Sequence, residues 1–217
     1  MAYIESTRLK KRQSEKNKNY FKYLIFALII IFVYFVFIKE KSVSLGPGVF
    51  APDDPEQINL EERKTIDFKG YKITFLAKFK IKAKVLSKEN YSYGREAELS
   101  PTDLALGWGR MSDEAIIKEF EFKQSGRWYF WKTASFPISR REIETHSANM
   151  HIIPADSLVE RVLKRIIKGQ IVEIEGYLVS VKADDGWSWE SSLSREDTGG
   201  HACELIYAED IVIVKSR

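Results

Sequence analysis

The chain is poor in the residues that most often carry covalent or metal chemistry. Its 217 residues include one cysteine, Cys203, and three histidines. A single cysteine excludes an intramolecular disulfide, so the folded part must be stabilised by its own hydrophobic core. There is also no internal repeat, no low-complexity tract and no motif that fixes a reaction. We therefore expect neither a cofactor nor a resident metal ion.

The chain also lacks a strong excess of charge of either sign. Its formal net charge is +3, with 34 Lys or Arg and 31 Asp or Glu. Residues 1–41 contain nine of the basic and three of the acidic residues, which leaves 25 and 28 in 42–217, a formal charge of −3. Nucleic-acid binders carry a basic face. The mildly acidic remainder therefore predicts that nucleic acid is not a partner.

One apolar run dominates the N-terminal region. Tyr23–Ile38 is unbroken, and Tyr20 and Phe21 extend it to nineteen residues with only Lys22 inside. A hydrocarbon core of about 30 Å takes about 20 helical residues, so the run can span a bilayer if Lys22 reaches the headgroups. A signal peptide has a shorter apolar region and a small-residue cleavage site, and core helices are seldom apolar all round. We predict a retained transmembrane helix, with its flank, over 23–41.

The charges beside this run predict its orientation. Residues 1–22 carry seven Lys or Arg against two Glu, whereas the opposite flank has two lysines beside one glutamate. The more basic flank stays in the cytoplasm. We therefore expect a cytoplasmic basic tail over 1–22, a linker rich in Pro, Gly and Asp over 42–57, and an extracytoplasmic domain over 58–217. The protein would then lie in the cytoplasmic (inner or plasma) membrane.

The region after the linker alternates in hydrophobicity as β-strands do. In 77–86, apolar residues occupy one face and four lysines the other, which predicts a half-buried strand. The segments 127–133 and 170–181 also predict strands, the second with a bulge at Gly176. An Asp185–Gly186 pair predicts a hairpin turn.

Two sequences carry helix-start signals. In 157–167, Ser157 and Glu160 form a capping box before an apolar stripe, and Ser100-Pro101-Thr102-Asp103 resembles a second start. Most predicted elements are nevertheless short strands, so the fold class is α+β with a mostly antiparallel β domain. The succession of helix, curved strand, hairpin and closing strand resembles the second half of a small OB-like barrel with inserted short helices.

The stretch SSLSREDTGGHACE, 191–204, gathers a thiol, an imidazole and several carboxylates. Its structural interpretation is a polar surface loop. Its catalytic interpretation makes Cys203 a nucleophile with His146 or His151 as base, because His201 lies two residues away on a strand and out of reach. That arrangement is similar to the sortases, membrane-anchored barrel transpeptidases with one Cys, one His and one Arg. Their Thr-Leu-x-Thr-Cys motif is absent, because Gly-Gly-His-Ala precedes the thiol here.

Aromatic residues beside turns are the candidates for recognition. Trp187 and Trp189 share one face of a predicted strand, where they either fill the core or form a platform for sugar rings or a peptide. Trp108 lies in a Gly-Trp-Gly sequence that exposes backbone around a large anchor residue, or else it is a core tryptophan between two turns. The candidate binding residues are Trp108, Arg110, Trp187, Trp189, Arg195 and Asp197.

These observations predict a single-pass membrane protein whose exported domain is a non-catalytic binding or scaffolding module. Its expected partners are the membrane, another envelope protein or a glycan wall component, and a second copy of the chain through Cys203. The alternative is a membrane-anchored hydrolase or transpeptidase, dependent on a thiol or a metal. That enzyme would use Cys203 with His146 or His151.

Overall fold

The computed structural model describes residues 20–32, 42–194 and 203–214, and it divides into two compact units, 1–41 and 42–217. In the first unit, residues 20–32 are helical. Among the described residues, no helix combines the length and the apolar character needed to cross a membrane. Residues 33–41 of the predicted membrane helix, 23–41, lie outside the described residues. Most of the predicted tail, 1–22, also lies outside them.

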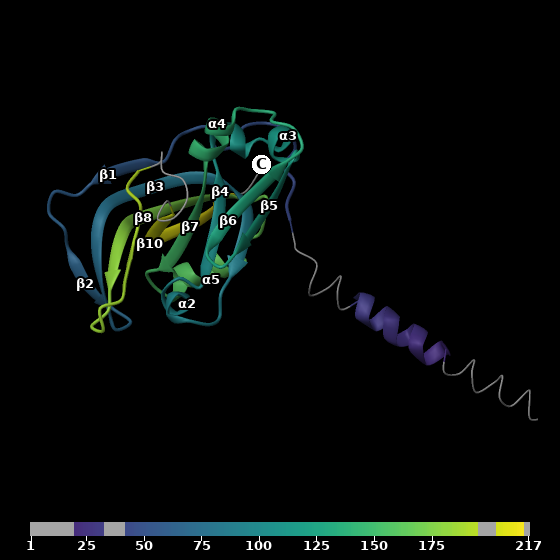
Figure 1. The fold of residues 1–217 in the computed structure, drawn as a ribbon, viewed down its shortest axis with the longest axis horizontal. Coiled ribbons are helices and arrows are strands. Elements are labelled where there is room, and N and C mark those ends of the chain that lie inside the picture. Colours follow the sequence, from purple (N-terminus) through teal and green to yellow (C-terminus); the bar gives the residue numbers. More distant parts are fainter. Residues whose placement is uncertain (1–19, 33–41, 195–202, 215–217) are drawn as a thin grey trace, which may run out of the picture. The chain divides into compact units, whose positions relative to one another are not determined.

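The unit 42–217 is a mostly β, α+β domain with few helices, which confirms the coarse fold class (Figure 1). The strands are β1 (Glu56–Asn59), β2 (Thr65–Phe68), β3 (Tyr71–Asn90), β4 (Thr102–Gly107), β5 (Phe120–Ser125), β6 (Trp128–Thr133), β7 (Ser147–Pro154), β8 (Ile171–Lys182), β9 (Ser188–Glu190) and β10 (Glu204–Val214). The helices are α2 (Arg95–Leu99), α3 (Glu114–Ile117), α4 (Arg140–Thr145) and α5 (Ser157–Arg165), with a 3-10 turn at Gly109–Ser112.

Five strands pair into a closed ring. The neighbours run β3, β4, β7, β10, β8 and back to β3, and the β7–β10 pair is parallel whereas the other pairs are antiparallel. The ring closes because β3 is 20 residues long and pairs with both β4 and β8. Register shifts between Phe75 and Ala77 and between Val85 and Ser87 bend β3, so that it arches round the barrel in Figure 1.

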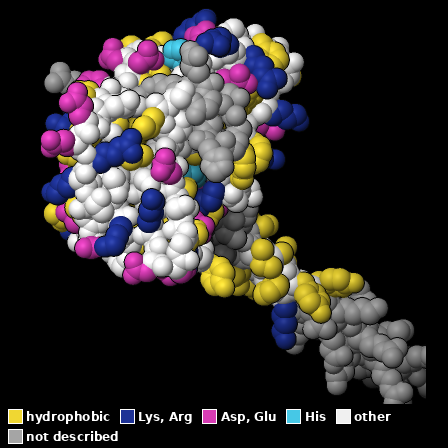
Figure 2. All heavy atoms as spheres, turned by 60° about the vertical axis from the view of Figure 1, so that its left-hand side comes forward, with side chains coloured by type: hydrophobic (Ala, Val, Ile, Leu, Met, Phe, Trp, Pro, Cys, Tyr) yellow, Lys and Arg dark blue, Asp and Glu magenta, His cyan; other side chains and the backbone are white. Residues whose placement is uncertain are grey.

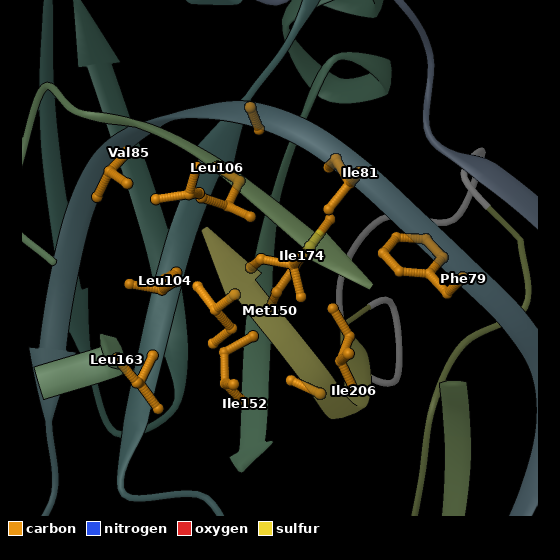
Figure 3. Close-up of a cluster of buried hydrophobic side chains, with 14 of the residues drawn as sticks. Phe79, Ile81, Val85, Leu104, Leu106, Met150, Ile152, Leu163, Ile174 and Ile206 are labelled. Atoms are coloured by element: carbon orange, nitrogen blue, oxygen red, sulfur yellow. The ribbon is translucent and has the colours of Figure 1, made fainter. Parts of the chain in front are cut away.

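Apolar side chains of the five ring strands fill the barrel interior (Figure 3). The predicted alternation in β3 is confirmed, because Phe79 and Ile81 are buried in this core. Helix α5 packs beside it through Val159 and Leu163. The core members labelled in Figure 3 are Phe79, Ile81, Val85, Leu104, Leu106, Met150, Ile152, Leu163, Ile174 and Ile206.

The hairpin formed by β5 and β6 covers the outer face of β4 and β7. Phe120 packs with Ala105 of β4 and Ile143 of α4 in a second apolar cluster. Beside this cluster, Gln124 Nε2 donates to Asn149 Oδ1 of β7 at 2.7 Å. The hairpin is therefore part of the folded domain, and these contacts bury its inner face.

Residues 42–51 are bound along one end of the barrel, and we call them the strap. Val43 N donates to Lys168 O at 2.8 Å, and Leu45 N donates to Glu114 Oε1 at 2.7 Å. Strand β4 ends here, where Gly107 pairs with Lys84, and begins at the opposite end, where Thr102 pairs with Asn90. We call these the strap end and the loop end. The region predicted as a linker, 42–57, therefore comprises the strap and the start of β1.

The prediction of a helix that starts at Ser100 is wrong. Residues 95–99 form α2, and Thr102 begins β4, in which every residue is buried. The Ser-Pro-Thr-Asp signal is local, and it is overridden because β4 lies between β3 and β7 and gains ladder hydrogen bonds on both sides.

Two other local predictions need smaller corrections. Helix α5 is confirmed, but its cap is Asp156, whose carboxylate accepts from Leu158 N and Val159 N. Gly176 marks a close approach: a Cβ there would lie 2.0 Å from Tyr207 O. The register shift itself is in the facing strand, between Ala208 and Asp210.

Candidate binding site

Two connections meet at the loop end of the barrel. The β3–β4 connection carries α2, and the β8–β10 connection carries β9. They are joined by Arg95, which donates from both terminal nitrogens to the Asp185 carboxylate, at 3.1 Å from Nη1. The same guanidinium lies 5.3 Å above the Trp187 ring. The predicted Asp185–Gly186 turn is confirmed and contributes directly to this contact.

An aromatic and arginine cluster extends from this junction. The rings of Trp187 and Trp189 lie 6.3 Å apart, and Tyr71 meets Trp187 edge-on at 5.8 Å. Arg127, from the tip of the β5–β6 hairpin, lies 3.7 Å from the Tyr91 ring and 5.5 Å from the Trp189 ring. We call Tyr71, Tyr91, Arg95, Arg127, Trp187 and Trp189 the loop-end cluster.

Both sequence interpretations of the tryptophan pair hold in part. Trp187 and Trp189 pack against the buried cluster that contains Ile153 and Val179, yet each stays half-buried. Half-buried rings that are fixed by neighbours present a rigid apolar surface at low entropic cost. The pair is therefore the rim of the core and at the same time an accessible surface.

An open groove of about 600 Å³ adjoins the cluster. Its walls include Tyr71, Arg95 and Glu98, and Tyr93 is 96% exposed beside it. The Tyr71 hydroxyl donates to Glu98 Oε2 at 3.3 Å, and burial together with the Glu98 carboxylate raises the pKa of Tyr71. The groove thus combines aromatic faces with a cation, an anion and a hydroxyl, which is the composition of a site for a polar ring or a peptide.

A buried ion pair supports this surface from beneath. Asp103 of β4 is fully buried, and its Oδ1 accepts from Arg127 Nη1 at 2.6 Å. Arg127 Nη2 also donates to Ser100 O at 2.9 Å. His151 Nδ1 lies 2.9 Å from the same Asp103 oxygen, but without the alignment of a hydrogen bond, and its ring lies 4.9 Å from Trp189. The pair therefore anchors the hairpin tip to the barrel.

Cys203 lies on the same outer face as His151. Its β10 neighbour Leu205 pairs with His151, so the thiol falls beside Asn149, which hydrogen-bonds it. Burial, followed by the charge of Glu204, raises the pKa of Cys203 to about 11. The thiol is therefore protonated at neutral pH, and a protonated, buried thiol is a poor nucleophile. This environment argues against the catalytic interpretation of Cys203.

Three other predicted residues lie at the strap end. Trp108 is 1% exposed, so its side chain belongs to the core, and its Nε1 donates to Asp54 Oδ1 at 3.0 Å. His146 Nε2 lies 3.7 Å from the same carboxylate, and Arg110 pairs with Glu142. The structure therefore separates His146 from Cys203 and His151.

The described residues form neither a grouping suited to a metal ion nor, along β3, a row of unpaired lysines. Within the described ranges, no group of three or more His, Cys, Asp or Glu is placed to hold a metal ion. The lysine row of β3 is cross-paired with β8, through Lys80–Glu175 at 3.3 Å and Lys82–Glu173 at 3.5 Å. On the face seen in Figure 2, basic and acidic side chains are interspersed. A basic stripe is therefore not formed there.

Sequence reasoning missed part of the site. Tyr71, Tyr91, Tyr93, Arg95 and Arg127 were not among the candidates, and the only local signal was the loop NYSYGR, 90–95, where aromatic, glycine and arginine residues alternate. The predicted binding residues Arg195 and Asp197 lie outside the described residues.

Comparisons with known proteins add nothing to this picture. No protein-family model, curated protein or solved structure matches the chain. The candidate site therefore depends on the geometry of the described residues alone.

Proposed function

We propose that the protein is a single-pass, membrane-anchored envelope protein whose extracytoplasmic domain is a non-catalytic binding or scaffolding module. The nineteen-residue apolar run and the basic residues before it support the anchor and its orientation. The unit 42–217 then engages another envelope protein or a wall component. The surface that makes this contact is the groove with the loop-end cluster.

The barrel topology supports this choice of surface. Numbered along the chain, the ring strands have the spatial order first, second, third, fifth, fourth, with α5 between the third and the fourth, and we infer an OB-like barrel. Such barrels bind ligands on the second and third strands and on the two flanking loops. Here the hairpin covers the strands β4 and β7. This leaves the two loops, of which the β3–β4 loop lines the groove and the β8–β10 loop contacts it through Arg95.

One observation carries the proposal: two guanidinium groups stack on three aromatic rings beside an open groove. Stacked aromatic and arginine side chains are the commonest anchors of recognition surfaces. They suit sugar rings and peptide side chains alike. The acidic balance of 42–217 and the paired lysines of β3 argue against a nucleic-acid ligand.

The enzyme alternative has less support. It needs a thiolate at Cys203 and a histidine base in hydrogen-bond contact with it, whereas the pKa of Cys203 is raised to about 11 and its hydrogen bond is to Asn149. A Cys203→Ser variant is therefore expected to keep full function in cells. Loss of function with a folded Cys203→Ser protein would favour the enzyme.

Site-directed photocrosslinking in intact cells tests the binding surface. A photoreactive residue at Tyr93 of the full chain is expected to capture a discrete partner, and Trp187→Ala is expected to lower the yield about tenfold or more. The control is the same residue at Ile58, which is 64% exposed on β1. Identical products from Tyr93 and Ile58 would contradict the proposal.

Protease accessibility tests the compartment. Protease added to intact spheroplasts is expected to digest the unit 42–217, because the positive flank holds the N-terminus inside. A domain that is cleaved only after detergent lysis would overturn the anchored, exported arrangement.

A further inference from the structure

The strap end contains a second concavity, of about 480 Å³. Its apolar walls come from four different elements: Val43 of the strap, Leu86 of β3, Ile117 of α3, and Phe120 and Phe122 of β5. Ligand sites in proteins are clefts of about 300–1,000 Å³ that combine such apolar walls with a few charged groups. Size and lining thus suit an apolar ligand with a polar head.

The charges around this cavity are unequal. Glu114 is neutralised by Lys84, whose Nζ lies 2.7 Å from Glu114 Oε1. Lys118 and Lys168 also line the cavity, and the Lys118 side chain is 68% exposed with a Glu119 carboxylate oxygen 3.9 Å from its Nζ. The cavity therefore carries an excess of positive charge, which is complementary to an anionic head group.

The chain enters the domain at this cavity. Ser42 is one of its lining residues, and the apolar run ends at Ile38, four residues earlier. Four extended residues reach about 14 Å at most. An apolar run embedded in a bilayer therefore leaves the hydrocarbon core no more than that length of chain before Ser42. The loop-end groove lies at the opposite end of β4.

We propose that the strap-end cavity binds an anionic membrane phospholipid, with an acyl chain against Phe120 and Phe122 and the phosphate at Lys118 and Lys168. This inference rests on the membrane anchor proposed above. It assigns the two ends different roles: the strap end holds the domain on the bilayer, and the loop end is presented to the partner. Anionic lipids are favoured over zwitterionic ones because two cations line the cavity in addition to the Lys84–Glu114 ion pair.

The test places p-benzoylphenylalanine at Phe122 of the full chain in its native membrane, with a second probe at Pro47 on the strap wall of the cavity. Irradiation is expected to give an adduct with the mass of a phospholipid at both positions. Lys118→Gln and Lys168→Gln are each expected to lower its yield about fivefold. The matched control is the same probe at Phe130, on the outward face of the hairpin and 54% exposed.

Several outcomes would overturn the inference. A crosslink to a second copy or to another protein at Phe122 would identify a different occupant, and equal lipid labelling at Phe130 would mean unspecific surface contact. A chain that stays in the membrane after carbonate extraction but gives no lipid adduct would remove the lipid site and leave the anchor intact. A chain released by carbonate would refute the anchor itself, and the lipid site with it.

Discussion

The two ends of the barrel each contain a buried ion pair, and the pairs are built in opposite ways. At the strap end the cation is the buried member: the Lys84 side chain is 1% exposed and the Glu114 side chain 19%. At the loop end the anion is buried: the Asp103 side chain is fully buried and the Arg127 side chain is 19% exposed. The separations are alike, 2.7 and 2.6 Å.

The carboxylates differ in how fully they are hydrogen-bonded. Glu114 accepts from Lys84 Nζ, Ser44 Oγ and two strap amides. Asp103 Oδ2 is buried with no hydrogen-bond partner among the described residues. A saturated carboxylate fixes its surroundings, whereas an unsatisfied acceptor costs free energy that other contacts must offset. We call the Glu114 carboxylate and the groups that donate to it the clamp. At the loop end, the corresponding carboxylate keeps one acceptor without a partner among the described residues.

Removal of the strap-end carboxylate is expected to have the largest effect. Glu114→Ala leaves the Lys84 ammonium buried without its counter-charge and releases the strap donors, so the free energy of unfolding should fall by about 4 kcal/mol. Urea denaturation of the full chain measures it. Glu119→Ala, at a half-exposed neighbour, should change stability by less than about 1 kcal/mol. Equal effects of the two variants would refute the clamp.

Acid should also weaken the strap end. Burial by itself would raise the pKa of Glu114, but hydrogen bonds from Lys84, Leu45 N and Ser44 outweigh it and lower the pKa from 4.5 to about 2. This stabilisation is present above about pH 5 and is lost as pH falls toward 2, on the order of 3 kcal/mol in total. In Glu114→Ala that part of the acid dependence should be absent. Parallel pH profiles of the two proteins would contradict the assignment.

Removal of the loop-end cation is expected to cost about 3 kcal/mol. Arg127→Met leaves the Asp103 carboxylate buried and unpaired. Adding Asp103→Asn to that variant should recover part of the loss, because the stranded charge is then removed. Thermal unfolding measures the stability loss in Arg127→Met and the recovery in the double variant. Arg63→Met, at an exposed site, is the control. No recovery in the double variant would mean that Arg127 acts by packing alone.

Two glycines with positive φ, one at each end of the barrel, differ in how closely other atoms surround them. A Cβ on Gly169 would lie 1.8 Å from Val43 O of the strap, whereas a Cβ on Gly186 at the loop end would meet nothing within 4 Å. Gly186→Ala should therefore cost only the left-handed backbone strain, about 1 kcal/mol. Gly169→Ala should cost about 2 kcal/mol or more, because the strap must also move. The reverse order in denaturation would refute the strap contact.

The smallest effect is expected for the thiol. With its pKa raised from 9.0 to about 11, Cys203 has about a hundredfold less thiolate at neutral pH than an ordinary cysteine. Iodoacetamide should therefore modify it about a hundredfold more slowly in the folded chain than in urea. Rapid alkylation of the folded protein would instead support the hypothesis that Cys203 is a nucleophile.

Several elements could be predicted because their signals are local. The alternation in β3, the apolar stripe of α5 and the Asp185–Gly186 turn each depend on residues a few positions apart. The helix expected at Ser100 failed for the same reason, since a capping signal of four residues says nothing of the strands on either side. The alternation of residues places Trp187 and Trp189 on one strand face, but the sequence does not reveal that arginines stack on them.

The apolar run, the acidic balance of 42–217 and the β-rich class can be predicted without a structure, because hydrophobic period and net charge follow directly from the order of residues. In contrast, it is folding that brings Arg95, Arg127 and Trp187 onto one surface and buries Asp103 and Lys84 with their partners. These contacts join residues tens of positions apart through ring closure of the strands. No local pattern encodes them, because their free energy arises only when distant segments exclude water together.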